Sequence, residues 1–182
     1  RATLARVAAY RAATTLPVSL RIYVADNGCT LDTASLSNDW ITIMPNRNLG
    51  GSGGFARCMM ACGADVTHML IMDDDIVFDS AVLAKTLSFL LLLRPQHFSL
   101  CLGGAMLPLD NPHLQFEAGG RLEARGVSGI GRSLDLREPA SLLKNETLDA
   151  PDYQAWWYCC LPRTRELPFP FFIKYDDVEH GI

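Results

Sequence analysis

Apolar residues along the first hundred positions follow two patterns, a helical spacing and short continuous runs. Helical spacing among helix-forming residues predicts helices, and a short apolar run that ends in turn residues predicts a buried strand. The predicted order is helix, strand, strand, helix, strand and helix, at residues 1–13, 19–25, 41–44, 55–64, 67–72 and 80–93. This order is typical of a mainly parallel sheet with helices on both faces.

The second half of the chain has a different pattern. Glycine pairs stand at 103–104 and 119–120, and short alternating stretches such as 114–118 lie between them. Alternation predicts strands with one exposed face, so we expect mixed or antiparallel strands here. Residues 132–152 show no clear period, and we expect a long surface loop with one helical turn.

The composition fits one globular domain and narrows its partners. Of the 182 residues, 49% are hydrophobic and 20% are charged, which suffices for a buried core. The net charge is −4 and no stretch is dense in Lys or Arg, so nucleic acid is not expected as a partner. Oligomeric state is left open.

The sequence also bears on location and on cysteine chemistry. The longest largely apolar stretch, 87–93, which contains Ser88, is far shorter than the roughly 20 residues that span a bilayer, and we see no secretory leader at the start of this sequence. We expect a cytoplasmic protein. Parts outside this chain could attach it to the inner face of the membrane, and the sequence leaves that open. The 6 cysteines form no CxxC pair, so reduced, mostly buried thiols are expected rather than structural zinc.

Polar groups follow three of the predicted strands. They are Asp26 and Asn27, the run Asn-Arg-Asn at 46–48, and the triad Asp73, Asp74 and Asp75. In open α/β sheets, ligands bind beyond the carboxyl ends of the strands, where the following loops converge. The sequence therefore predicts a binding site at this edge of the sheet.

The Asp73–Asp75 triad favours a bound cation. Three consecutive carboxylates repel one another, and a hard divalent cation such as Mg²⁺ or Mn²⁺ removes that cost while its other positions take phosphate oxygens and water. The alternative is a helix N-terminus or solvated turn enriched in Asp, although three acids exceed what capping requires.

The glycine-rich run 50–54 opens the helix predicted at 55–64. Glycines allow a ligand to approach backbone N–H groups closely at a positive helix end. A flexible loop or tight packing between helix and strand explains the same residues, so the run is weak by itself.

An acidic pair and a tryptophan pair complete the candidates. Asp176 and Asp177 follow an apolar run, and a carboxylate beside a sugar hydroxyl can act as a general base, the alternative being a helix-capping acid cluster. Trp156 and Trp157 offer aromatic faces to the C–H groups of a sugar ring, the alternative being core packing.

Four motifs together resemble family 2 glycosyltransferases, and most closely galactofuranosyltransferases and related rhamnosyltransferases. They are Ala-Asp-Asn-Gly at 25–28, Asn-Arg-Asn-Leu-Gly-Gly-Ser-Gly-Gly-Phe at 46–55, Met-Asp-Asp-Asp at 72–75 and Phe-Ile-Lys-Tyr-Asp-Asp at 172–177. Their order and spacing match over nearly the whole chain. The resemblance implies a GT-A-like α/β fold, a three-layer sandwich with a mixed, mainly parallel central sheet.

The same resemblance implies a role for each site residue. The donor nucleotide sugar would contact Asp26, Asn27, Asn48, Gly53, Gly54, Arg57, Asp73 and Asp74. Asp73 and Asp75 would bind Mn²⁺ or Mg²⁺ with the diphosphate. Asp177 would deprotonate the acceptor hydroxyl beside Asp176, and Trp156 with Trp157 would form the acceptor wall.

The implied activity is inverting transfer of a sugar to a saccharide or lipid-linked glycan in cell-wall or surface polysaccharide synthesis. Galactofuranose from UDP-galactofuranose is the first expectation, and rhamnose from dTDP-rhamnose the second. Residues 1–98 would form the nucleotide-sugar-binding half and 99–182 the acceptor-binding and catalytic half of one domain. The family's first strand would precede residue 1, and a further metal-binding histidine would follow residue 182, so we expect a fragment.

Two other classes of function remain open. The spacing Gly51-x-Gly53-x-x-Ala56, with Asp73 further on, formally fits the dinucleotide fingerprint of an NAD-dependent oxidoreductase. That fingerprint needs a strand that enters the glycine turn directly, whereas Pro45 and four more residues intervene. A non-catalytic carbohydrate-binding module is the other alternative.

Overall fold

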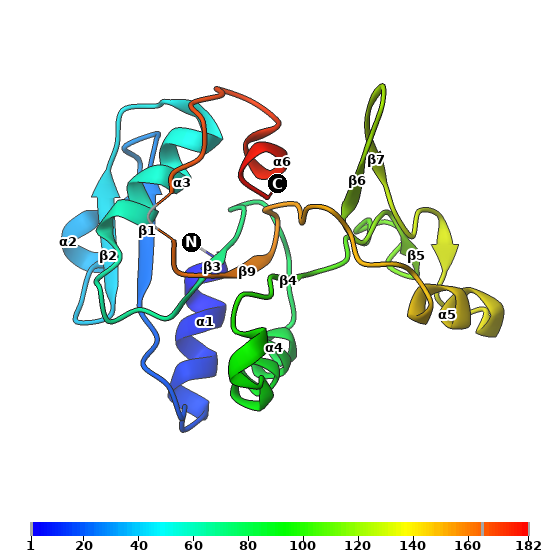
Figure 1. Cartoon of the computed structure of the whole chain (residues 1–182). Coiled ribbons are helices and arrows are strands. Elements are labelled where there is room, and N and C mark those ends of the chain that lie inside the picture. Colours follow the sequence, from blue (N-terminus) through cyan, green and yellow to red (C-terminus); the bar gives the residue numbers. More distant parts are fainter. Residues whose placement is uncertain (1, 165, 182) are drawn as a thin grey trace.

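The computed structural model describes residues 2–164 and 166–181 (Figure 1). The first half contains the six predicted helices and strands, with the fourth beginning at Gly50 rather than at residue 55, and one short helix at 33–36 that the sequence did not predict. They are α1 (Ala2–Ala13), β1 (Ile22–Asp26), α2 (Thr33–Leu36), β2 (Ile41–Pro45), α3 (Gly50–Ala61), β3 (His68–Ile71) and α4 (Ser80–Leu92).

The second half is made of short elements that connect to one another mainly through loops. They are a 3₁₀ turn η1 (Pro95–His97), β4 (Leu102–Gly103), β5 (Leu114–Gln115), β6 (Gly120–Glu123), β7 (Gly126–Gly129), β8 (Leu134–Asp135), α5 (Pro139–Glu146), β9 (Cys159–Pro162) and α6 (Asp176–Gly181). Antiparallel pairing of β5 with β8 and of β6 with β7 confirms the prediction for this half. Figure 1 shows these pairs and α5 to one side of the α/β part.

The sheet differs from the mainly parallel one that the sequence predicts. β1 and β2 pair in parallel, with Ile22 opposite Ile41, but they form a two-stranded sheet of their own. β3 belongs to a second sheet of order β3-β9-β4, in which both pairings are antiparallel. The reason is that β9, an apolar run from late in the chain, lies beside β3 and runs in the opposite direction.

Local signals explain where the helices begin. The side chain of Asp79 accepts a 2.8 Å hydrogen bond from the backbone N–H of Ala81 and caps α4, which ends before Pro95. At α3, the side-chain oxygen of Asn48 accepts a 3.0 Å hydrogen bond from the N–H of Gly50. Both helices thus satisfy donors at their first turns with side chains from the preceding loop.

Two buried clusters hold these elements together. One packs α3 against β3 and β9, and contains Met59, Met69, Ile71, Trp156, Cys159 and Leu161. The other packs α1 and α4 beneath the sheet, and contains Val7, Phe78, Leu83 and Tyr158. Inside the second cluster the hydroxyls of Thr86 and Tyr158 lie 2.8 Å apart and satisfy each other.

The prediction of reduced, mostly buried cysteines holds in part. All six cysteines are free, but only Cys159 and Cys160 are fully buried, whereas Cys29 and Cys101 are exposed. Of the helices described, none has the length and apolar character needed to cross a membrane.

Candidate active site

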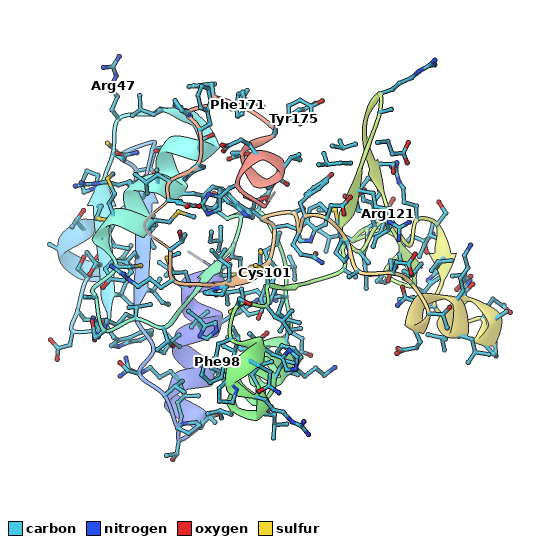
Figure 2. The ribbon with its side chains drawn as sticks, viewed as in Figure 1. Arg47, Phe98, Cys101, Arg121, Phe171 and Tyr175 are labelled. Carbon is cyan, nitrogen blue, oxygen red and sulfur yellow. The ribbon has the colours of Figure 1, made fainter. Side chains whose placement is uncertain are left out.

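One pocket of about 670 Å³ collects several of the predicted residues. It lies between the start of α3, the end of β3, the loop before β9 and the segment that leads into α6. Its lining includes Gly51, Phe55, Asp73, Phe116, Glu117, Val127, Tyr153, Ala155, Trp156, Trp157 and residues 172–178. Figure 2 shows Tyr175 at the upper edge of this region, with Phe171 beside it above α3.

The pocket brings together acids from opposite ends of the sequence. Asp73 follows β3, and Asp176 and Asp177 open α6, yet all three side chains line the same cavity. Burial raises the pKa of Asp73 to about 6, and the negative charges of Asp75 and the α6 pair add to that shift. Burial also raises the pKa of Asp177, and the neighbouring Asp176 adds to it.

The pKa of the Asp73 carboxyl and that of the Asp177 carboxyl are each raised first by burial and then by the neighbouring negative charges, and a bound cation would offset both effects. Asp74 and Asp75 are exposed and lie outside the lining, although the charge of each acts on Asp73. Across residues 2–164 and 166–181, no three His, Cys, Asp or Glu side chains form a ready-made metal cluster. The oxygen donors are the type that Mg²⁺ and Mn²⁺ prefer, so the cation stays a prediction that the chemistry of the donors supports.

The polar groups after β1 and β2 form a network that holds the start of α3. Asp26 is buried and accepts a 2.7 Å hydrogen bond from the N–H of Leu31. The side chain of Asn27 accepts from Asn46 at 2.8 Å and donates to the carbonyl of Gly50 at 3.2 Å. These predicted donor-binding residues therefore also stabilise the fold, as does Asn48, which accepts a hydrogen bond from Gly50 just before α3.

Close packing accounts for two of the predicted donor-binding glycines. A Cβ at Gly53 would lie 2.4 Å from the Cβ of Leu49, and one at Gly54 would lie 3.2 Å from Nδ2 of Asn27. Tight packing between helix and strand, the alternative raised from the sequence, thus describes Gly54, which faces Ala25 and Asn27 at the end of β1, whereas Gly53 is packed against Leu49 at the start of its own helix. Arg57 is exposed on α3, and its contact with a donor stays a prediction.

The two tryptophans have different environments. Trp156 is 5% exposed and packs edge-on against Phe55 and His180, at centroid distances of 5.0 and 5.4 Å. Trp157 is half-buried, and its Nε1 donates a 2.6 Å hydrogen bond to the carbonyl of Gly104. Core packing therefore describes most of Trp156, while both rings contribute to the pocket wall.

Sequence reasoning missed the side of the pocket formed by the second half. Phe116, Glu117 and Tyr153 line it. Burial raises the pKa of Glu117 against the opposing charge of Arg132, whose Nε lies 3.9 Å from Oε2. Glu117 and Tyr153 are held at the site by single antiparallel β-bridges, Met106 with Glu117 and Gly120 with Tyr153. The sequence offers no local signal for such bridges.

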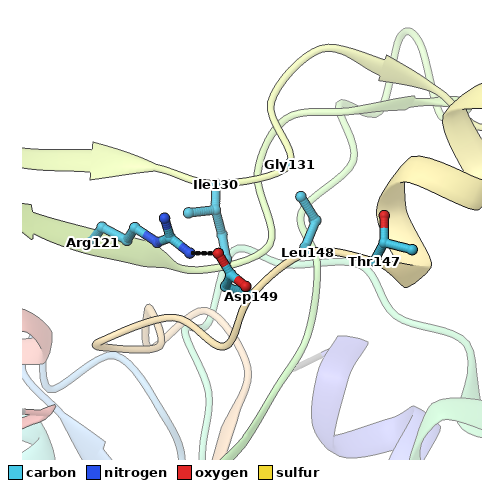
Figure 3. Close-up of a pocket in the computed structure, with 6 residues that line it drawn as sticks. All are labelled: Arg121, Ile130, Gly131, Thr147, Leu148 and Asp149. Carbon is cyan, nitrogen blue, oxygen red and sulfur yellow. Dashed lines mark hydrogen bonds and ion pairs between the residues drawn. The ribbon is translucent and has the colours of Figure 1, made fainter.

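A second cavity, of about 250 Å³, lies apart from the predicted residues (Figure 3). It sits between β6, β7 and the end of α5, and Leu148 and Thr147 form part of its wall. On one side the guanidinium of Arg121 donates a 2.6 Å hydrogen bond to the carboxylate of Asp149. None of the residues that the sequence singled out lines it.

Comparison of the sequence with known proteins shows the class of protein to which this chain is related. Curated relatives of the chain are glycosyltransferases, whereas no protein-family model matches it. The chain is 31% identical over 170 residues to galactofuranosyltransferase GlfT2 of Mycolicibacterium smegmatis, covering 83% of this chain and 26% of that protein. It is 31% identical over 160 residues to galactofuranosyltransferase GlfT2 of Mycobacterium tuberculosis, covering 78% of this chain and 24% of that protein.

The resemblance drawn from the motifs is therefore confirmed: this chain is galactofuranosyltransferase-like over about four fifths of its length. It spans about a quarter of the length of the curated relatives it matches. These relatives do not favour the NAD-dependent alternative.

Proposed function

We propose that the protein transfers a galactofuranosyl group from UDP-galactofuranose to a saccharide or lipid-linked glycan in cell-wall polysaccharide synthesis. The observation that carries this proposal is the single pocket that joins Asp73, the α6 acids and the tryptophan wall. The names of the curated relatives support the choice of sugar. A GT-A-like arrangement of the whole parent domain is part of the proposal.

In the proposed reaction, Asp177 acts as the general base. An acceptor hydroxyl held at the pocket wall loses its proton to the Asp177 carboxylate while its oxygen attacks the anomeric carbon. The bond from that carbon to the diphosphate breaks on the opposite face, and its electron pair leaves with UDP. The anomeric configuration is thereby inverted.

The acids around Asp73 hold the other reaction partner. Asp73 and Asp75 would bind Mn²⁺ or Mg²⁺, and the bound cation would stabilise the negative charge on the departing diphosphate. Asp176 and Asp74 complete the negative surroundings that favour such an ion. A pKa of Asp177 held above its usual value by burial suits a proton acceptor.

The donor nucleotide would lie beyond the ends of β1 and β2. Asp26, Asn27 and Asn48 stand at this edge, Gly53 and Gly54 lie in the first half of α3, and the exposed Arg57 further along that helix would reach toward the donor. One oxygen of Asp26 is engaged by Leu31, so its proposed contact with the nucleotide uses the other oxygen. The acceptor would enter from the opposite side, along Trp156 and Trp157.

A panel of nucleotide sugars tests this function. The full-length parent protein is incubated with each donor and a glycan acceptor in Mn²⁺ or in EDTA, and released nucleoside diphosphate is measured. We expect turnover with UDP-galactofuranose in Mn²⁺ and an inverted anomeric centre in the product by NMR. Turnover with dTDP-rhamnose alone would establish the rhamnosyltransferase instead. Donor binding without turnover would establish a carbohydrate-binding module.

A further inference from the structure

The acids of α6 are carried by an irregular segment, residues 167–175, which we call the strap. It has no helix or strand, and its large side chains are exposed, with 56% exposure for Phe172 and 72% for Ile173. Lys174 and Tyr175 both have positive φ angles, 69° and 68°. Side-chain burial therefore contributes little to its position, and other contacts must fix it.

One such contact comes from α6, where the carboxylate of Glu179 accepts a 2.9 Å hydrogen bond from the N–H of Phe169, and two more come from the first turn of α3. The N–H of Gly51 donates a 3.3 Å hydrogen bond to the carbonyl of Phe172, and the hydroxyl of Ser52 donates to the carbonyl of Phe171. Ser52 is only 1% exposed, so its hydroxyl is committed to the strap. Figure 1 shows this part of the chain rising beside α3 before it turns into α6.

The absence of side chains at the first two glycines permits this approach. A Cβ at Gly50 would lie 1.9 Å from the carbonyl oxygen of Phe172, and Gly50 has a φ of 77°. A Cβ at Gly51 would lie 3.3 Å from Oδ2 of Asp176. The glycine turn thus touches both the strap and the acidic pair that follows it.

We propose that Ser52, Gly50 and Gly51 are positioning residues that hold the strap and so place Asp176 and Asp177 opposite Asp73. This inference rests on the proposed function, because it assigns these residues to the placement of its acids. It gives part of the glycine run a role different from donor contact: the turn seats the strap. A misplacement of reacting groups by about 1 Å can cost on the order of 100-fold in rate.

The test uses Ser52→Ala and Gly51→Ala in the full-length protein. Ser52→Ala removes the hydroxyl, and Gly51→Ala presses on Asp176 while improving helix propensity. We expect roughly 10- to 100-fold lower kcat in both, with UDP affinity within about twofold of wild type. Gly51→Ala should keep or raise Tm. If Gly51 only stabilised the fold, turnover would be lost only together with a lower Tm. If Ser52→Ala fails to fold, Gly51→Ala decides the matter.

Hydrogen exchange separates this inference from the proposed function. Amides of 166–181 should exchange faster in Ser52→Ala than in wild type, whether or not the sugar donor has been identified correctly. Thr86→Val, which removes another buried hydroxyl far from the strap, should leave both that exchange and kcat unchanged. Wild-type exchange and kcat in Ser52→Ala, or weakened UDP binding as the sole effect of Gly51→Ala, would overturn the positioning role.

Discussion

The indole of Trp157 is fixed in orientation by its 2.6 Å hydrogen bond to the carbonyl of Gly104. A held aromatic face suits a sugar ring, so Trp157→Ala should raise the acceptor KM roughly tenfold and change the Kd for UDP much less. Trp157→Phe keeps an aromatic face without the hydrogen bond and should fall between the two. Steady-state kinetics and UDP titration measure these effects. Loss of cooperative unfolding in Trp157→Ala would support core packing instead.

Removal of Asp177 as a base should affect chemistry more than binding. Asp177→Asn keeps shape and hydrogen bonding but cannot accept a proton, so kcat should fall by about 10² to 10⁴-fold with little change in UDP affinity. Asp176→Asn should alter KM as well, since that side chain touches the glycine turn. Asp149→Asn, beside the smaller cavity, serves as the control with normal turnover. Full activity in both α6 variants would show that Asp176 and Asp177 only cap the helix and take no part in catalysis.

The predicted cation can be tested through nucleotide binding. Asp75→Ala should abolish the Mn²⁺-dependent part of UDP affinity while the protein still unfolds cooperatively, because a carboxylate ligand of the ion is lost. Calorimetric titration in Mn²⁺ and in EDTA gives the two affinities. Asp110→Ala, exposed and outside the pocket, should retain the difference between them. An Mn²⁺ effect that persists in Asp75→Ala would remove this residue from the site.

The raised pKa of Asp73 predicts a pH-dependent instability without metal. A carboxyl with a folded pKa of about 6 binds more protons in the folded than in the unfolded chain between about pH 4 and 6, so stability falls as pH rises through that window. In EDTA, Asp73→Asn should therefore have a higher Tm than wild type at pH 7 and the same Tm near pH 4. Differential scanning calorimetry checks this. A lower Tm for Asp73→Asn at pH 7 would contradict a raised pKa of Asp73.

Much of the first half could be predicted because its signals are local. The Asp79 cap and Pro95 mark the ends of α4, and Asn48 with the glycines marks the start of α3. The acids after the strand predicted at 67–72 indicated the pocket that Asp73 lines, whereas Asp26, Asn27 and residues 46–48, which follow strands of another sheet, lie outside its lining. In these cases the residues that define an element are neighbours in sequence.

Long-range pairing explains what could not be predicted. The apolar run Cys159–Pro162 gives no sign that it pairs with β3 rather than extending a parallel sheet. Glu117 reaches the pocket through a bridge to Met106, and Ser52 meets a carbonyl far along the chain. Such contacts depend on how separate segments pack, which spacing within either segment does not encode.

The order β3-β9-β4 has a consequence for synthesis on the ribosome. The central strand of this sheet, β9, is synthesised last. The backbone N–H and C=O groups of β3 and β4 that pair with it therefore stay without partners until residues 159–162 emerge. Nascent chains that stop earlier therefore expose apolar strand edges and should depend on chaperones or aggregate. Because β3 lies in residues 1–98 whereas β4 and β9 lie in residues 99–182, we expect neither half to fold alone.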